Sequence, residues 1–311
     1  MTEQSNEQRT VRNTNRLFLG TLCFVMAVSF WMGRSGISLS GEMNLIVSQL
    51  LFWIPIVICL AVTKTNPLHL IPFRKISVST MLMVILFAIL LIPVTAWINL
   101  VSMLFVENAV AGIDQQMTGN TLALNLLMMA VLPAVSEECM VRGVYFQLYK
   151  SGGILKAAVI SGAVFGFIHL NFNQFSYAIV LGVILALLVE ATGSIFSSMI
   201  AHFTFNAQSV AALWFQNQMF NSAGETALQE VTRADLTEML MGYTTFACIM
   251  GVLAFSVFLW IVHHCGSEDH MKQIFLKRQS EDGKKVKMVT PAFAAGVVFA
   301  VGIMILMERI V

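Results

Sequence analysis

A small group of ionisable residues interrupts stretches of the chain that are otherwise apolar. They are Glu137, Glu138, Arg142, His169, Glu190 and His202. Placing an ionisable side chain in a membrane costs free energy, so such residues are functional candidates by default.

The two adjacent glutamates face different directions on a helix. Glu138 and Arg142 are four residues apart, so they share a face and can form an ion pair that orients the site. Glu137 is rotated by about 100° from Glu138, which places it poorly for neutralisation by the same arginine. A carboxyl group that no arginine neutralises is suited to act as a general base.

Two histidines and an asparagine complete the candidate set. His169 follows Phe165 by one helical turn, and His202 and Asn206 share a face because they are four residues apart. Glu137 could take a proton from water with help from His169, while His202 and Asn206 donate hydrogen bonds to the oxyanion of a tetrahedral intermediate. That chemistry is hydrolysis of a peptide bond. The carboxylate and the two imidazoles could instead hold a divalent metal such as zinc, and spacing alone leaves both alternatives open.

The composition indicates that membrane-spanning helices position these residues. Hydrophobic residues make up 57% of the chain and charged residues 11%, and the mean hydropathy is +0.78. Because soluble domains carry roughly 25% charged residues, this chain has too little charge to cover a soluble surface. The expected fold is all-α, a polytopic transmembrane helical bundle. Disordered chains, collagens, disulfide scaffolds and nucleic-acid binders are excluded.

About nine segments are long and apolar enough to be spans, since a spanning helix needs about 20 mostly apolar residues. They are 17–33, 43–62, 78–106, 120–150, 154–170, 175–191, 194–216, 239–264 and 291–308. The chain then divides into a cytoplasmic tail (1–16), N-terminal transmembrane helices (17–119), a catalytic core (120–216), an extracytoplasmic loop (217–238) and C-terminal transmembrane helices (239–311) with a charged cytoplasmic loop (265–290).

The distribution of positive residues predicts the orientation. Fourteen of the 18 Lys and Arg residues fall in the N-terminal tail and in the loops after the second, fourth and eighth spans, whereas three fall in the alternate loops and at the C-terminus. Cytoplasmic loops are enriched in Lys and Arg. The N-terminus is therefore predicted to be cytoplasmic and the C-terminus external.

Counting residues along the helices predicts that the candidate residues share one depth. Glu137 and His169 each lie thirteen residues from the lysine that ends or begins their span, and His202 lies twelve residues from Glu190. At a rise of 1.5 Å per residue, each is about 18–20 Å from the cytoplasmic boundary. The sequence thus predicts a polar catalytic cavity among the fourth, fifth and seventh spans.

Three short motifs resemble a known family of membrane proteases. Residues 137–143 match the pattern Glu-Glu-x-x-x-Arg, residues 165–169 match Phe-x-x-x-His, and residues 202–206 match His-x-x-x-Asn/Asp. Their order and spacing resemble those of the CAAX-protease and bacteriocin-processing (CPBP, or Abi) family, which includes the Ras-converting CAAX-prenyl endopeptidase. The resemblance covers roughly residues 120–210. Val141 departs from the pattern, because many members have Phe before the arginine.

The resemblance implies a role for each matched catalytic residue. Glu137 would be the catalytic glutamate that activates water, and His169 would assist it. His202 and Asn206 would stabilise the oxyanion. The implied enzyme is an intramembrane endopeptidase of the glutamate type.

The resemblance also implies which residues support the site. Glu138, Arg142 and Phe165 would hold it together without reacting. No cofactor is required in this mechanism. Zinc is the alternative, with Glu137, His169 and His202 as its ligands, although the chain has no His-Glu-x-x-His motif of a site-2-type zinc protease.

Functions of other classes stay open. A non-proteolytic scaffold or immunity protein could keep the same fold, and a proton-coupled transporter could use Glu137 and His169 as a relay. The complete motifs favour the enzyme, and the absence of an internal repeat disfavours the transporter. The expected partners are a membrane-associated protein or peptide substrate and the lipid bilayer, not nucleic acid. The expected location is the bacterial plasma membrane.

Overall fold

The computed structural model describes residues 3–106, 120–223, 233–276 and 286–309, and every regular element in these ranges is a helix. In chain order the helices are α1 (Glu3–Arg34), α2 (Gly41–Val62), α3 (Pro67–Leu70), α4 (Val78–Met103), α6 (Leu122–Leu126), η2 (Leu127–Val131), α7 (Leu132–Glu138), η3 (Cys139–Tyr145), α8 (Phe146–Tyr149), η4 (Lys150–Gly152), α9 (Ile154–Ile168), α10 (Phe172–Thr192), α11 (Ile195–Ala223), α12 (Arg233–His264), α13 (Glu268–Leu276) and α14 (Pro291–Glu308). The elements from α6 to η4 form one continuous helical run, the 122–152 run. The all-α expectation is confirmed for the described part of the chain.

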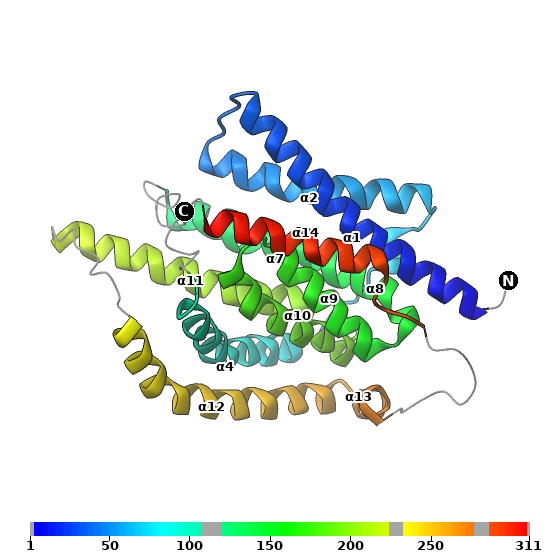
Figure 1. Cartoon of the computed structure of the whole chain (residues 1–311). Helices are drawn as coiled ribbons and strands as arrows, with labels where there is room; N and C mark the ends of the chain where they lie inside the picture. The colour runs from blue at the N-terminus through cyan, green and yellow to red at the C-terminus, as the bar shows by residue number, and fades with distance from the viewer. Residues whose placement is uncertain (1–2, 107–119, 224–232, 277–285, 310–311) are drawn as a thin grey trace.

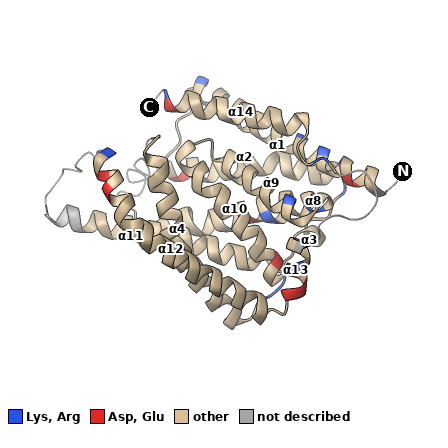
Figure 2. Cartoon of the chain, turned by 60° about the horizontal axis from the view of Figure 1, so that its bottom comes forward, with Lys and Arg blue, Asp and Glu red and all other residues tan. Residues whose placement is uncertain are grey.

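Within the described ranges, seven helices are long and apolar enough to cross a membrane. They are α1, α2, α4, the 122–152 run, α10, α12 and α14. Most of the Lys, Arg, Asp and Glu residues lie toward the ends of the helices, which leaves a largely uncharged middle (Figure 2). The chain is therefore an integral membrane protein.

Two of the nine expected spans, 154–170 and 194–216, correspond to helices that do not meet both the length and the hydropathy of a membrane-crossing helix. α9 has 15 residues, about 22 Å at 1.5 Å per residue, whereas the hydrocarbon core is about 30 Å thick. α11 is long enough at 29 residues, but many of its side chains are polar. Both helices carry candidate site residues and pack among other helices, so neither needs the length or the composition of a lipid-exposed span. The nine-span count and the orientation stay predictions.

Helix boundaries also differ from the expected segments in the polar stretches. α1 begins at Glu3, so most of the expected tail is helical. Within the expected loop 217–238, α11 continues to Ala223 and α12 begins at Arg233, and residues 224–232 lie outside the described residues. Within the expected loop 265–290, α13 is a short helix, and residues 277–285 lie outside the described residues.

The helices pack in layers around the central elements. Figure 1 shows α1, α2 and α14 on one side and α4 and α12 on the other, with α9, α10 and α11 between them. The start of α1 is tied to the centre by buried polar contacts. Tyr149 Oη donates to Asn15 Oδ1 at 2.7 Å, and Asn15 Nδ2 donates to the carbonyl of Met288 at 2.8 Å. These bonds explain why the polar stretch before Leu17 belongs to the folded helix.

α9 and α10 approach so closely that the contact requires glycine. A Cβ on Gly182 would lie 2.6 Å from the Cα of Gly162, and a Cβ on Gly162 would lie 3.0 Å from the carbonyl oxygen of Ile179. Gly166, four residues after Gly162, is equally restricted by the side chain of Ile179 at 2.6 Å. Small residues at this spacing let membrane helices pack backbone to backbone. The contact fixes the position of α9, which carries the second motif.

The ends of the 122–152 run and of α10 lie at one level. Lys150 Nζ lies 2.7 Å from Glu190 Oε1, and His270 Nε2 lies 2.8 Å from Glu190 Oε2. Lys150 and Glu190, from which the depths of Glu137 and His202 were counted, are therefore in direct contact. Glu190 joins three elements at this end and is not part of the candidate site.

Candidate active site

The first motif lies where the helix geometry changes. α7 ends at Glu138 as an ordinary α-helix, and the π-helical segment η3 follows from Cys139 to Tyr145. π-Helical turns inside α-helices are frequent at functional sites. Glu138 and Arg142 remain on the same side of the run across this change, because their side chains are in contact.

Glu138 is the centre of a buried ion-pair network. Its Oε1 accepts hydrogen bonds from Arg142 Nη1 and from His202 Nδ1, each at 2.8 Å. The side chains of Glu138 and Arg142 are both 0% exposed. Arg142 Nη2 also donates to the carbonyl of Gly182 on α10 at 3.3 Å. The predicted ion pair is present, and it also holds the histidine of the third motif.

The contact with Glu138 decides which nitrogen of His202 carries a proton. A carboxylate paired with an arginine only accepts hydrogen bonds, so Nδ1 of His202 must be the donor. Nε2 is then an acceptor in the neutral ring and a donor in the imidazolium. His202 can therefore donate to an oxyanion through Nε2 only when the ring is protonated.

Glu137 is separate from this network. Its side chain is 16% exposed. Oε1 accepts a hydrogen bond from Gln49 Nε2 of α2 at 3.0 Å, and Oε2 lies 3.9 Å from His202 Nε2. The second distance is too long for a direct hydrogen bond. Oε2 thus faces the histidine without being bonded to it.

The ring of Phe165 joins the second motif to the other two. The guanidinium of Arg142 lies over this ring, 4.3 Å from its centroid, in a cation–π contact. The rings of His169 and His202 meet Phe165 edge-on, with centroid distances of 4.9 and 5.8 Å. His169 Nδ1 lies 2.6 Å from the carbonyl oxygen of Phe165. Because a carbonyl only accepts, Nδ1 carries the proton and Nε2 is the basic nitrogen of the neutral ring.

Asn206 has the fewest contacts of the candidates. It lies one turn after His202 on α11 and is half-buried, and its side chain makes no hydrogen bond to the residues that the structure describes. Direct contacts connect Glu138, Arg142, Phe165, His169 and His202, and Glu137 faces His202 Nε2 at 3.9 Å. Among the described residues, the amide of Asn206 therefore has donors and acceptors available for another partner.

The two histidines bear on the zinc alternative, because imidazole nitrogens are ligands that zinc commonly takes. The described part of the chain holds no group of three His, Cys, Asp or Glu side chains that could bind a metal ion. In both histidines the bonded nitrogen is Nδ1, in His202 to Glu138 and in His169 to the backbone, so Nε2 is left for a further partner. Histidines that bind metal ions are commonly oriented by such a bond at the other nitrogen.

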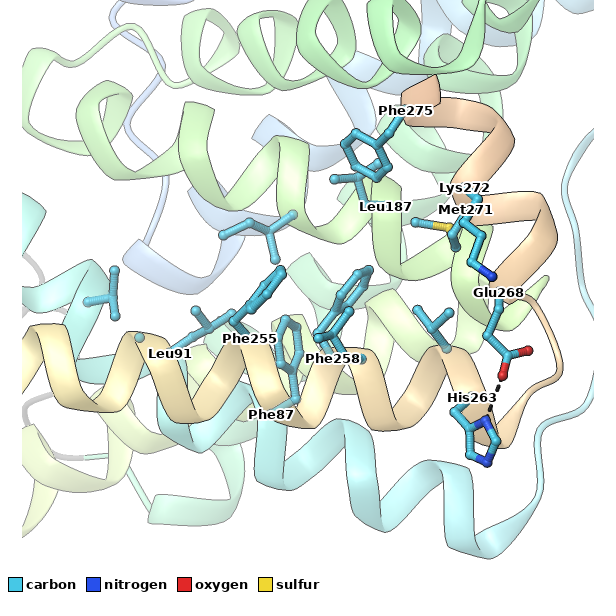
Figure 3. A pocket seen from close by; sticks show the side chains of 15 residues that line it. Phe87, Leu91, Leu187, Phe255, Phe258, His263, Glu268, Met271, Lys272 and Phe275 are labelled. Carbon is cyan, nitrogen blue, oxygen red and sulfur yellow. Dashed lines mark hydrogen bonds and ion pairs between the residues drawn. The ribbon is translucent and has the colours of Figure 1, made fainter. Parts of the chain in front are cut away.

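Two cavities lie outside the candidate site. One, of about 910 Å³, is lined by α4, α10, α12 and α13. Figure 3 shows the rings of Phe87, Phe255 and Phe258 along it and the bonded pair His263 and Glu268 at one end. The hydrogen bond from His263 holds the pKa of Glu268 below its usual value. A second cavity, of about 760 Å³, lies around the end of α10. Glu190 lines the second cavity, but none of the motif residues lines either one, so a catalytic cavity among the spans stays a prediction.

Sequence reasoning missed two residues of α2. Gln49 contacts Glu137, and Trp53, four residues later, donates from Nε1 to Ser136 Oγ at 2.8 Å. Gln49 is one of few polar side chains in α2, which was the available signal. Because its amide is not ionisable, a search for charged residues in apolar segments does not find Gln49.

Comparison with known proteins finds a family similarity in the central part of the chain. A family model of Rce1-like type II CAAX prenyl endopeptidases matches residues 119–208. This range contains all three motifs and excludes α2. The chain matches no curated protein and no solved structure at a significant level. The family match confirms the resemblance that the three motifs carry: residues 119–208, less than a third of the chain, are similar to CAAX-type (CPBP) membrane proteases.

Proposed function

We propose that the chain is a glutamate-type intramembrane endopeptidase that hydrolyses a peptide bond of a membrane-associated protein or peptide. The family match supports proteolysis. The main observation in support of general-base catalysis is how the two carboxylate oxygens of Glu137 are placed. One oxygen of its carboxylate is held by Gln49, and the other faces His202 Nε2 at 3.9 Å without a bond.

The proposed reaction begins with water. Oε2 of Glu137 takes a proton from the water, and the water oxygen forms a bond to the carbonyl carbon of the peptide. The electron pair of the carbonyl bond moves to its oxygen, which becomes the oxyanion. Protonated His202 and the amide of Asn206 donate hydrogen bonds to this oxyanion. As the carbon–nitrogen bond breaks, Glu137 returns the proton to the leaving nitrogen, and a carboxylic acid and an amine are released.

The remaining candidates support these steps. His169 assists, because its Nε2 can accept a hydrogen bond from the same water and so orient it while Glu137 takes the other proton. Glu138 and Arg142 hold His202, and Phe165 packs against Arg142 and both histidines.

The substrate and the setting are proposed at the level of class. The matched family is named for type II CAAX prenyl endopeptidases, and the proposed substrate here is a protein or peptide with a membrane-attached segment. The proposed location is the bacterial plasma membrane, with the N-terminus in the cytoplasm. No cofactor is required in this proposal, and zinc held by Glu137, His169 and His202 is the alternative that experiment must address.

Comparing peptide ends in two sets of membranes tests the proposal. One set contains the wild-type chain, and the other contains Glu137→Gln, which has the same shape but cannot take the proton. New peptide ends should appear with the wild type and be absent with the variant. Equal amounts and equal thermal stability of the two proteins serve as the control. Identical peptide ends would instead favour a scaffold that keeps the fold.

A further inference from the structure

α2 reaches the candidate site through two polar side chains on one face. Gln49 Nε2 donates to Glu137 Oε1 at 3.0 Å, and Trp53 Nε1 donates to Ser136 Oγ at 2.8 Å. Gln49 and Trp53 are four residues apart and so lie one turn apart on the same side of α2. Their partners are consecutive residues of α7. A helix outside the matched range 119–208 therefore bonds to two adjacent positions of the first motif's helix.

The bond from Gln49 restricts the side chain of Glu137. A glutamate side chain has several rotatable bonds. When it is partly exposed, its carboxylate can turn freely unless a bonded partner fixes it. A hydrogen bond to an ionised oxygen is stronger than one between neutral groups. With Oε1 fixed on the side of α2, Oε2 stays directed at His202. A general base works only when it is held within a narrow geometry.

We propose that Gln49 is a positioning residue for Glu137. Its amide fixes Oε1 so that Oε2 stays directed at the water it deprotonates. This inference rests on the proposed function. It gives α2, which carries none of the three motifs, a direct part in the active site.

The other charged or titratable groups around Glu137 come from three elements. Glu138 and Arg142 follow it on the 122–152 run, His202 faces it from α11, and Tyr177 lies within electrostatic range on α10. Among the residues that the structure describes, Gln49 is the side chain that donates a hydrogen bond to Glu137. Removing Gln49 therefore leaves Oε1 without its protein donor while these charges remain.

Two substitutions remove the bond in different ways. Gln49→Leu has no donor, and Gln49→Asn keeps the amide but is one methylene too short to reach Oε1. Asn44→Leu is the matched control, because Asn44 is an exposed amide on the same helix. Trp53→Phe removes the neighbouring contact and should lower thermal stability without affecting the carboxylate of Glu137.

The first measurement is infrared and does not depend on activity. Subtracting the spectrum of Glu137→Gln from that of the wild type isolates the carboxylate bands of Glu137. A hydrogen bond to one oxygen changes the separation between the antisymmetric and symmetric stretching bands. Both Gln49 variants should change this separation, and Asn44→Leu should not. Unchanged bands in Gln49→Leu would overturn the inference.

The second measurement is turnover of a substrate found in the comparison of peptide ends. Misplacing a catalytic group by about 1 Å can cost about 100-fold in rate, so kcat of both Gln49 variants should fall by about 10- to 100-fold with KM unchanged. Shifted bands with an unchanged kcat would show a contact of no catalytic consequence and also overturn the inference. If wild-type membranes contain no cleaved substrate, the proposed function fails, and the infrared result still decides whether Gln49 holds the carboxylate.

Discussion

The two glutamates of the first motif have different partners although they are adjacent in sequence. Glu138 accepts hydrogen bonds from Arg142 and His202 in the protein interior, whereas Glu137 accepts one from Gln49 at the edge of the site. A rotation of about 100° between neighbouring helical positions is enough to produce this separation. One carboxylate thus bonds two side chains of the site, and the other keeps one oxygen, Oε2, without a direct hydrogen bond to His202.

Replacing Arg142 tests the supporting role of the ion pair. Both partners are 0% exposed, and removal of one partner from a buried pair typically costs about 3–5 kcal/mol. Arg142→Ala should therefore lower the thermal unfolding temperature and the folded yield in detergent, together with activity. Arg34→Ala is the control, because Arg34 is exposed at the end of α1. Wild-type stability combined with lost activity would move Arg142 into the catalytic group.

At the scale of residues, local contacts were predictable and distant ones were not. The pair of Glu138 and Arg142 follows from a spacing of four positions on one helix. The bond from His202 to Glu138 spans 64 positions, and the bond from Gln49 to Glu137 spans 88. Such contacts depend on how helices are rotated and packed, which the period of a single helix does not specify.

At the scale of elements, the contact between α9 and α10 holds the second motif in place. Gly182→Ala would put a Cβ 2.6 Å from the Cα of Gly162, where only backbone movement can relieve the clash. Overpacking of this kind costs about 1–3 kcal/mol. Gly242→Ala on α12 is the control, because a Cβ there meets nothing within 4 Å. The thermal unfolding temperature should fall for Gly182→Ala and not for Gly242→Ala. Equal unfolding temperatures of the two variants would mean that α9 and α10 can move apart without a loss of stability.

Helix positions were easier to predict than helix limits. Apolar length located the spans corresponding to α2, α4, α10, α12 and α14, because lipid-facing helices must be long and apolar. The same criterion does not describe α9 and α11, which pack among other helices and carry polar site residues. It also misses the helical start of α1, where buried Asn15 replaces apolar packing with hydrogen bonds.

At the scale of the whole molecule, composition alone predicted an all-helical membrane protein, since a chain with 11% charged residues cannot cover a soluble surface. The family match covers the middle of the chain, residues 119–208, where the motifs lie. The flanking helix α2 contributes directly to this part, because its side chains donate hydrogen bonds to the helix of the first motif. The site is thus assembled from both inside and outside the matched range.

The central claim is that Glu137 activates water without a metal ion, and the most direct test is cleavage by purified protein after prolonged chelation. Metal content is measured in parallel, and wild type is compared with Glu137→Gln. General-base catalysis contributes about 100- to 10,000-fold. The chelated wild type should keep its rate, and folded Glu137→Gln should lose at least about 100-fold. Stoichiometric zinc, with activity lost on chelation and restored by zinc, would contradict the account, as would a Glu137→Gln variant that cleaves at the wild-type rate.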